Sequence, residues 1–195
     1  MSSKGYHFRD VIGKKVLIVG EVGTGKTFMT AKLLVEAVEA GLEAQVTILD
    51  LAPKAIILEG GKVGGRIGDI IYLPTHIRYL TSDEIRAPRI EGRSKEEVIS
   101  YAKKNFEVIE KLFDEYRAAV TSILFVNDVT FYLHMGDIGG LKEVFSKAET
   151  VIVNAYEGTM LQFDFGMGIS DRERNLVNLL KKMVDVIIKT GSKVV

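Results

Sequence analysis

Eight consecutive residues near the N-terminus combine three glycines, a cation and a hydroxyl at a spacing suited to phosphate chemistry. They are Gly20, Glu21, Val22, Gly23, Thr24, Gly25, Lys26 and Thr27. Because glycine has no Cβ, consecutive backbone N–H groups can turn toward one anion. Lys26 can then reach the β- and γ-phosphates of a nucleotide, and the Thr27 hydroxyl can bind Mg²⁺. The segment predicts a site for a nucleoside triphosphate with magnesium.

The flanking residues predict the two elements that would hold this segment. Lys15–Val19 is a short, β-branched apolar run that indicates a buried strand. Thr27–Ala40 has apolar side chains at helical spacing, and Gly41 is placed to end that helix. The helix N-terminus would add unpaired N–H groups and the positive end of its dipole. Phe28, in its first turn, completes the set that we expect to bind the nucleotide.

The pattern G-x-x-x-x-G-K-T between a strand and a helix resembles the Walker A motif of the P-loop NTPase superfamily. The resemblance covers residues 20–27 closely and the rest of the chain loosely, and it identifies no subfamily. Residue Glu21 stands where MinD-like ATPases carry an extra lysine. The resemblance implies a three-layer α/β fold: a mostly parallel sheet, helices on both faces, and the nucleotide at the carboxyl ends of the strands.

Strand and helix patterns alternate along the remaining chain, which by itself favours parallel βαβ units. Further strands are predicted at Ala44–Leu49, Ser122–Val126 and Thr150–Val153, with a short one at Ile70–Leu73. Helices are predicted from Ser94, where Ser94 and Glu97 form a capping box, to Ala119, and at Leu141–Ala148. The C-terminal part is predicted as a helix from Ser170 to Met183 followed by a strand, or as one helix to Lys189.

Two carboxylates at strand ends are candidates for the magnesium site. Asp128 follows the most apolar strand, and Asp50 follows the strand before the irregular segment. We favour Asp128 and keep Asp50 as the alternative. In many ATPases that this sequence resembles, Asp-Glu ends the corresponding strand, whereas this chain has Asn127-Asp128. Either Asp128 binds the metal and the catalytic glutamate is missing, or both acids are replaced. Both readings argue against fast autonomous hydrolysis.

An irregular segment at about 58–93 interrupts the alternation and is rich in glycine and cationic side chains. Its cations are Lys62, Arg66, Arg78, Arg86, Arg89 and Arg93. An insertion of this length is uncommon without a function, and arginine grips phosphate or carboxylate with two parallel hydrogen bonds. In P-loop kinases, members of the superfamily that the sequence resembles, comparable insertions form lids and acceptor pockets, and we expect Arg66 to be a mobile phosphate contact. His76 and His134 are predicted to be structural or surface residues.

The sequence favours ATP over GTP as the nucleotide. Residues 154–157 keep only the asparagine of the guanine-binding pattern N-K-x-D, and Asn154 is a candidate for a base contact. Residues 137–140 fit the γ-phosphate pattern D-x-x-G, but a glycine-rich turn is the better reading of so short a match.

Composition restricts the remaining classes of protein. The chain has 195 residues, 47% of them hydrophobic, which suits a single domain over 1–195. Equal numbers of acidic and basic residues, 26 each, give no strong nucleic-acid signal, and no apolar run is long enough to span a bilayer. With no cysteine and no signal-peptide pattern, we expect a cytoplasmic protein. Abundant Lys, Glu, Ile and Val hint at a thermophile.

Three functions follow from these residues. The first is phosphoryl transfer from MgATP to water or to a small-molecule acceptor, with Lys26, Asp128 and Arg66 as the catalytic residues. The second is a nucleotide-dependent switch or assembly factor whose slow hydrolysis is accelerated by a protein partner. A third is a nucleotide-binding domain without catalysis that serves in homo-oligomer formation.

Overall fold

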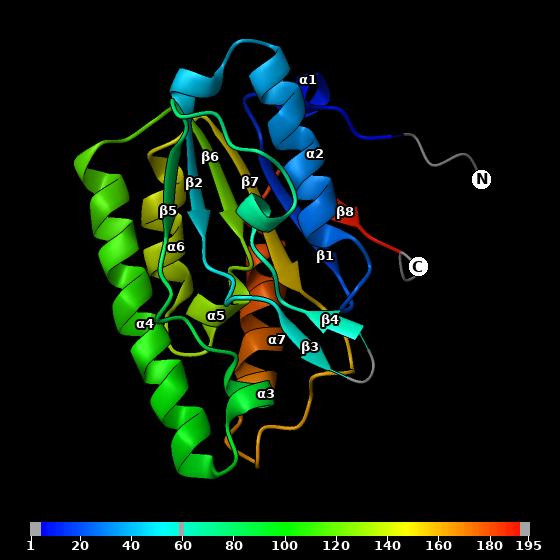
Figure 1. The fold of residues 1–195 in the computed structure, drawn as a ribbon, viewed down its shortest axis with the longest axis vertical. Coiled ribbons are helices and arrows are strands. Elements are labelled where there is room, and N and C mark those ends of the chain that lie inside the picture. The colour runs from blue at the N-terminus through cyan, green and yellow to red at the C-terminus, as the bar shows by residue number, and fades with distance from the viewer. Residues whose placement is uncertain (1–4, 59–60, 192–195) are drawn as a thin grey trace.

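The centre of the protein is a six-stranded sheet in which every pairing is parallel. The structure is a computed structural model, and it describes residues 5–58 and 61–191 (Figure 1). The strands lie in the order β5 (Arg78–Thr81), β2 (Val46–Asp50), β6 (Ile123–Asn127), β7 (Thr150–Tyr156), β1 (Lys15–Gly20) and β8 (Val186–Lys189). The predicted α/β class with a mostly parallel sheet is therefore confirmed.

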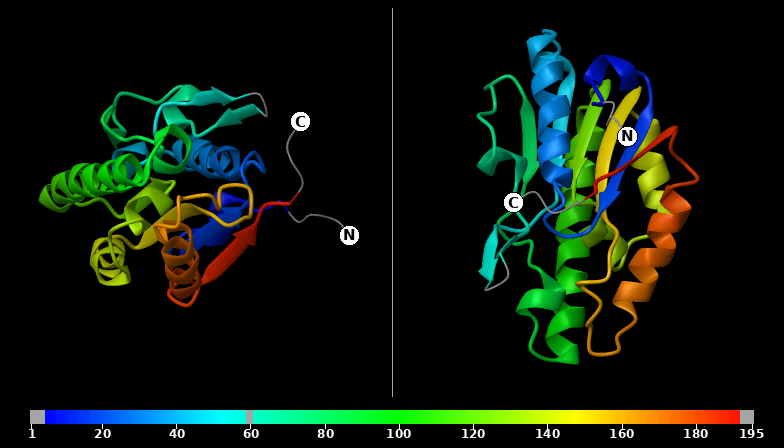
Figure 2. Two further views of the ribbon diagram at one scale, coloured as in Figure 1. Left: turned by 90° about the horizontal axis from the view of Figure 1, so that it is seen from below. Right: turned by 90° about the vertical axis from the view of Figure 1, so that its right-hand side faces the viewer.

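Helices cover both faces of this sheet (Figure 2). The helices of the described residues are α1 (Phe8–Val11), α2 (Lys26–Glu39), α3 (Pro88–Glu91), α4 (Lys95–Ala118), α5 (Thr130–Leu133), α6 (Ile138–Ser146) and α7 (Ile169–Leu180), and α3 lies beyond the strand ends rather than on a face (Figure 1). A separate antiparallel hairpin joins β3 (Ile56–Leu58) to β4 (Gly61–Val63). Short 3₁₀ helices occupy Glu43–Gln45 and Ile67–Asp69.

Side chains alternate along each strand between two hydrophobic cores. On β1, Ile18 faces a core that includes Leu34 of α2, while Leu17 faces a core that includes Phe113 of α4. All these side chains are inaccessible to solvent. Strands that are buried on both faces read as continuous apolar runs, which is why residues 15–19 and 122–126 could be recognised.

The N-terminus of α4 has the capping residues that the sequence predicted. The Ser94 hydroxyl accepts a hydrogen bond from the Glu97 N–H at 3.2 Å, so Ser94 is the N-cap. The Glu97 carboxylate bonds the N–H of Arg93, at 2.8 Å, rather than that of Ser94. Together these bonds use donors that the start of a helix would otherwise leave unpaired.

The irregular segment differs from its prediction in one strand. Residues 70–73 are not a strand but follow the 3₁₀ turn, and the Ile71 N–H bonds the Ile67 carbonyl at 3.1 Å. Their apolar pattern reflects Ile71 and Leu73 packing against the α2-side core. The strand of this region is β5, a half-buried edge strand whose pattern is weaker. Residues 59–60 of the predicted insertion lie outside the described residues.

At the C-terminal end, the broken arrangement is the one observed. Helix α7 ends at Leu180, and β8 pairs in parallel with β1, with Ile188 opposite Ile18. An unbroken helix to Lys189 was the wrong alternative. The turn between them lets Ile188 reach the α2-side core, which a straight helix on the opposite face could not do.

The strand order fixes where a ligand can lie. Strand β7 separates β1 from β6, and the chain leaves β1 toward α2 on one face but leaves β7 toward α7 on the other (Figures 1 and 2). In open α/β sheets, such a divergence opens a crevice at the carboxyl ends of the strands. The glycine-rich bend, the hairpin β3–β4, α3 and α5 all lie at that end of the sheet (Figure 1).

Candidate functional site: a glycine-rich bend and its cavity

The bend between β1 and α2 depends on glycine at three points. Gly23 has φ 74° and Gly25, the N-cap of α2, has φ 87°, both in the left-handed region that favours glycine. Gly20 is required for a different reason. A Cβ there would overlap the Thr190 hydroxyl and would lie 2.6 Å from the Thr24 hydroxyl.

Backbone donors of the bend are free to receive an anion. Among the described residues, the N–H groups of Gly23, Gly25, Lys26 and Thr27 donate to no protein acceptor. These include the first unpaired donors of α2, where the helix dipole also favours negative charge. The N–H of Thr24 makes only a long bond, 3.4 Å, to the Glu21 carbonyl. The bend is therefore curved and open, as a phosphate-binding loop must be.

Glu21 braces the bend from outside. Its carboxylate accepts hydrogen bonds from the N–H groups of Val22 at 2.8 Å, Thr159 at 2.7 Å and Met160 at 3.2 Å. Burial alone would raise the pKa of this carboxyl, but the three donors outweigh burial and the pKa is lowered. A side chain at Gly158 would collide with the same carboxylate. Glu21 thus ties the bend to the loop after β7.

Lys26 is folded back over the bend. Its Nζ donates to the Glu21 carbonyl at 2.8 Å and lies 5.8 Å from the centre of the Tyr156 ring. Burial lowers the pKa of Lys26, while Asp128 and Glu21 act in the opposite direction. The ammonium is thus held over the glycine-rich bend, and Lys26 lines the cavity that this bend borders.

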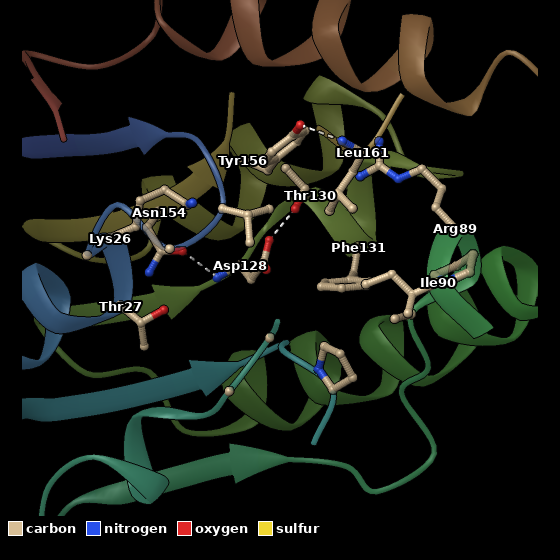
Figure 3. Close-up of a pocket in the computed structure, with 18 of the residues that line it drawn as sticks. Lys26, Thr27, Arg89, Ile90, Asp128, Thr130, Phe131, Asn154, Tyr156 and Leu161 are labelled. Atoms are coloured by element: carbon tan, nitrogen blue, oxygen red, sulfur yellow. Dashed lines mark hydrogen bonds between the residues drawn. The ribbon is translucent and has the colours of Figure 1, made fainter. Parts of the chain in front are cut away.

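Asp128 stands at the end of β6 with its backbone in the left-handed region, at φ 57°. Its N–H donates to Asn154 Oδ1 at 2.9 Å, and its carboxylate accepts from the Thr130 hydroxyl (Figure 3). Burial raises the pKa of Asp128, and the Thr130 hydroxyl and the charge on Lys26 oppose that rise only in part. This desolvated carboxylate is suited to meeting a cation.

The bend and Asp128 border one cavity of about 430 Å³. Its walls come from the bend and α2, from the irregular segment predicted at about 58–93 (called the central segment below), and from residues at or after the ends of β6 and β7 (Figure 3). Residues from the bend and α2 are Val22, Gly23, Gly25, Lys26, Thr27 and Phe28; those from the central segment are Gly64, Gly65, Ile70, Ala87, Pro88, Arg89 and Ile90. The remaining wall includes Pro53, Thr130, Phe131, His134, Asn154, Tyr156 and Leu161.

Thr27 and Asp128 fit a magnesium ion that a bound nucleotide would complete. Both line the cavity, and both offer oxygen, the ligand that Mg²⁺ prefers. Mg²⁺ at phosphate sites commonly uses one or two protein oxygens with phosphate oxygens and water. Within residues 5–58 and 61–191 no group of three or more His, Cys, Asp or Glu side chains is placed to hold a metal by itself.

Asp50, the alternative metal ligand, does not face the cavity. Its carboxylate accepts from the N–H of Ile67 at 2.7 Å, the hydroxyl of Tyr79 at 2.8 Å and the amide of Asn127 at 2.7 Å. The side chain is fully buried, and burial raises its pKa above the ordinary value. Because both carboxylate oxygens of Asp50 already accept hydrogen bonds, Asp50 is not suited to bind magnesium. The alternative that Asp50 is the metal ligand is therefore wrong.

The role predicted for Arg66, a mobile phosphate contact, is also wrong. Its guanidinium donates to the carbonyls of Ala52 and Ser82, at 3.3 and 2.6 Å, and pairs with Asp83 at 2.7 Å. Only 8% of the residue is exposed. It does not line the cavity, because these three bonds use it to hold the central segment together.

The arginine that does line the cavity is Arg89, from α3. It makes two bonds to Glu173 of α7, at 2.7 and 3.1 Å, and lies 5.4 Å from the centre of the Tyr156 ring. Glu173 also contacts His134 Nε2, at 2.9 Å. The side chains of Arg89, Glu173 and His134 are all buried. Of the two positions expected for His134, structural or surface, the buried one is observed, and His134 also forms part of the cavity wall.

Asn154 and Asn127 are both buried in the sheet beside the cavity. Asn154 is 1% exposed and its amide bonds Thr30, Asn127 and the Asp128 N–H. An amide committed in this way has little freedom to read a base, although Asn154 does border the cavity.

Sequence reasoning missed Tyr156 and Glu173 and did not single out Arg89 from the six cations of its segment. The sequence offered one signal for Tyr156. The strand predicted to end at Val153 continues to Tyr156, so Tyr156 stands at the carboxyl end of β7. Nothing local distinguishes Glu173 from other acids of an amphipathic helix.

Comparison with known proteins adds little to this geometry. No family profile matches the sequence, and no curated protein sequence matches it. Among solved structures, C. elegans PCH-2 is similar with a TM-score of 0.30 and 11% identity, over 92% of this chain and 36% of that one. The chain therefore spans just over a third of that protein's length, and a similarity this low carries no argument about function. No helix within the described ranges is both long and apolar enough to cross a membrane.

Proposed function

We propose that this protein binds a magnesium–nucleoside triphosphate, with ATP favoured, and transfers the γ-phosphoryl group to water or to a small acceptor. One observation carries the proposal: the open N–H groups of the bend face the same cavity as Lys26, Thr27 and Asp128. A helix N-terminus, a cation and two oxygen ligands on one cavity are the parts that a phosphate–magnesium site needs.

Each residue has a distinct part in this proposal. The N–H groups of Gly23, Gly25, Lys26 and Thr27 bind phosphate oxygens, and the Lys26 ammonium leaves the Glu21 carbonyl for the β- and γ-phosphates. Thr27 and Asp128 hold the magnesium, directly or through water. Bound Mg²⁺ neutralises charge on the phosphate oxygens, and the protein's contribution is position and electrostatics.

The reaction itself needs little covalent chemistry from the protein. The acceptor oxygen forms a bond to Pγ, the bond from Pγ to the β,γ-bridging oxygen breaks, and the nucleoside diphosphate leaves. The acceptor's proton is released with the products. Arg89 replaces Arg66 as the arginine closest to this chemistry, because it borders the cavity and Arg66 does not.

The central segment favours an acceptor with an apolar body. It contributes Ile70, Pro88 and Ile90 to the cavity wall, and Phe131 of α5 lies beside Ile90 (Figure 3). Water alone would not need such a wall, since apolar lining is typical of pockets for small molecules.

A nucleotide-dependent switch is the second candidate function. Its supporting observation is that the residue before Asp128 is Asn127, whose amide is engaged by Asp50, Gly65 and Asn154, so the acidic pair that the resemblance implies is not present at the end of β6. A partner protein, or a second copy of the chain, would then complete the site. The same bound nucleotide would order the central segment, and a partner would recognise that state.

A panel of ATP, GTP, ADP and GDP, each with Mg²⁺ and with EDTA, tests the proposal. Thermal shifts report binding, and release of diphosphate reports turnover. We expect the largest shift with MgATP. Acceptor-dependent ADP release supports transfer, and slow hydrolysis that only a partner protein accelerates supports the switch. The absence of any shift with all four nucleotides would contradict both.

A further inference from the structure

A continuous line of buried amide and carboxylate groups joins the phosphate-binding helix to the central segment. It runs across the carboxyl ends of three neighbouring strands, through Asn154 on β7, Asn127 on β6 and Asp50 on β2. All three side chains are at most 1% exposed. Burying so many polar atoms is costly unless every one is bonded, so their arrangement is strongly constrained.

At the nucleotide end, the line begins with the backbone of Lys26. The Thr30 hydroxyl donates to the Lys26 carbonyl at 3.0 Å, and the Asn154 amide donates to the Thr30 oxygen at 2.9 Å. Asn154 Oδ1 accepts from the Asp128 N–H at 2.9 Å. One amide therefore bonds both Thr30 of α2 and the backbone N–H of Asp128, the residue that we assign to magnesium.

In the middle, Asn127 must donate and accept at once. Its Oδ1 accepts from Asn154 at 2.8 Å, and its Nδ2 donates to Asp50 at 2.7 Å and to the Gly65 carbonyl at 3.2 Å. An aspartate here could not donate to either partner and would set a second carboxylate against that of Asp50. This explains why asparagine occupies a position where the ATPases that the sequence resembles carry an aspartate.

At the far end, Asp50 holds the central segment. Its second oxygen accepts from the Ile67 N–H and the Tyr79 hydroxyl, at 2.7 and 2.8 Å. Gly65, which Asn127 bonds directly, lines the cavity. The line therefore ends on the wall where an acceptor would lie, and the same line of hydrogen bonds supports both that wall and the backbone of Asp128.

We propose that Asn127 is a positioning residue that couples nucleotide binding to the order of the central segment at residues 64–71. Nucleotide that fixes Lys26 and Asp128 fixes the amide of Asn154, then that of Asn127, and finally Gly65 and Asp50. Coupling of this kind is reciprocal, so loosening the segment through Asn127 weakens nucleotide binding in turn. The inference rests on the proposed function, because a nucleotide must bind for the coupling to act.

Hydrogen exchange of the peptide covering residues 64–71, with and without MgATP, tests the coupling without using turnover. Calorimetry first establishes whether the wild-type protein binds MgATP. If it does, we expect exchange in this peptide to slow by roughly tenfold on binding, the ratio that corresponds to about one hydrogen bond. Asn127→Ala should exchange faster in the free protein and should lose most of the nucleotide-dependent slowing.

Asn105→Ala is the matched control. Asn105 is equally buried and also holds the central segment, through bonds to the backbone of Arg86 at 2.9 and 2.8 Å, but it has no contact with Asn127 or Asn154. It should lose comparable stability and keep the slowing at 64–71. If Asn127→Ala and Asn105→Ala lose the nucleotide-dependent slowing equally, the effect is one of general stability and the coupling is overturned.

A double substitution separates the bond to Asp50 from the bond to Gly65. Asn127→Asp alone removes both and sets two carboxylates together. Adding Asp50→Asn restores a donor–acceptor pair between positions 50 and 127 with its direction reversed, but leaves the Gly65 carbonyl without its donor. We expect the double variant to regain stability and not the nucleotide-dependent slowing. Recovery of the slowing would contradict a path through Gly65.

The outcomes also separate this inference from the proposed function. Wild-type protein that fails to bind MgATP would contradict both the coupling and the proposed function. Wild-type protein that binds MgATP but shows no change of exchange at 64–71, or an Asn127→Ala variant that keeps the full change, would overturn the coupling alone.

Discussion

The backbone N–H of Asp128 donates a hydrogen bond to Oδ1 of Asn154, with 2.9 Å between the two atoms. This bond joins β6 to β7 at the end of the sheet and holds Asp128 in a left-handed backbone conformation, at φ 57°. Because the backbone is fixed in this way, the carboxylate points into the cavity that the glycine-rich bend borders (Figure 3). The relationship makes the role of Asp128 testable separately from that of Asp50.

Asp128→Asn should remove the dependence of ATP affinity on Mg²⁺. Asparagine tolerates the left-handed backbone and carries no charge to bury, so the free energy of unfolding should be unchanged or higher. MgATP affinity should fall about tenfold or more, because an amide is a weaker ligand for Mg²⁺ than a carboxylate. Calorimetric titrations at several Mg²⁺ concentrations measure this.

Asp50→Asn is the comparison for that experiment. It should keep the Mg²⁺ dependence but lose about 1–3 kcal/mol of stability, since an amide cannot accept from Ile67, Tyr79 and Asn127 together. A loss of Mg²⁺ dependence in this variant instead would return the metal site to Asp50.

Gly25→Ala should lower both stability and nucleotide affinity. Alanine at φ 87° costs about 1–2 kcal/mol, and relaxing the strain turns the free N–H groups away from a common centre. Gly41→Ala is a close control, because Gly41 has φ 75°, lies at the other end of α2 and leaves a Cβ free of contacts. It should cost similar stability, measured by denaturant unfolding, with affinity unchanged. Equal affinity in both variants would show that the shape of the bend does not matter.

Arg89 and Arg66 should differ in what they support. Removing Arg89 alone would leave Glu173 buried without its partner, so the pair is better replaced as Arg89→Met with Glu173→Met. This double variant should fold and lose about tenfold or more in turnover. Arg66→Met should lose stability and keep the turnover of the folded fraction. Unchanged turnover in the double variant would exclude Arg89 from the chemistry.

Glu21 should make part of the stability depend on pH. Its pKa is lowered in the folded protein, so its contribution is complete above the unfolded value of 4.5 and is lost as the pH falls through the lower, folded value. The difference in unfolding free energy between wild type and Glu21→Gln should therefore be constant from pH 7 to about pH 5 and shrink below that. Glu107→Gln, at an exposed position of α4, serves as the control. A difference that stays constant to pH 3 would contradict this account of Glu21.

Local patterns predicted the elements but not their neighbours. The run before Gly20 and the spacing after it identify β1, the bend and α2, because each depends on residues close in sequence. The insertion of β7 between β1 and β6 depends on the β1–β7 pairing, in which Lys15 lies opposite Val151, and no local pattern records a pairing between residues so far apart in the chain. The same limit explains the arginines: only tertiary contacts with Asp83 and Glu173 separate Arg66, which holds the central segment, from Arg89, which borders the cavity.

Binding of MgATP to wild type, Lys26→Ala and Lys142→Ala, measured by calorimetry under one set of conditions, tests the central claim most directly. The claim is that the N–H groups of the bend and one ammonium form a nest for a triphosphate. It predicts tight binding by the wild type and by Lys142→Ala, whose side chain is exposed on α6, and no tight binding by Lys26→Ala. Micromolar affinity retained by a folded Lys26→Ala protein would contradict it.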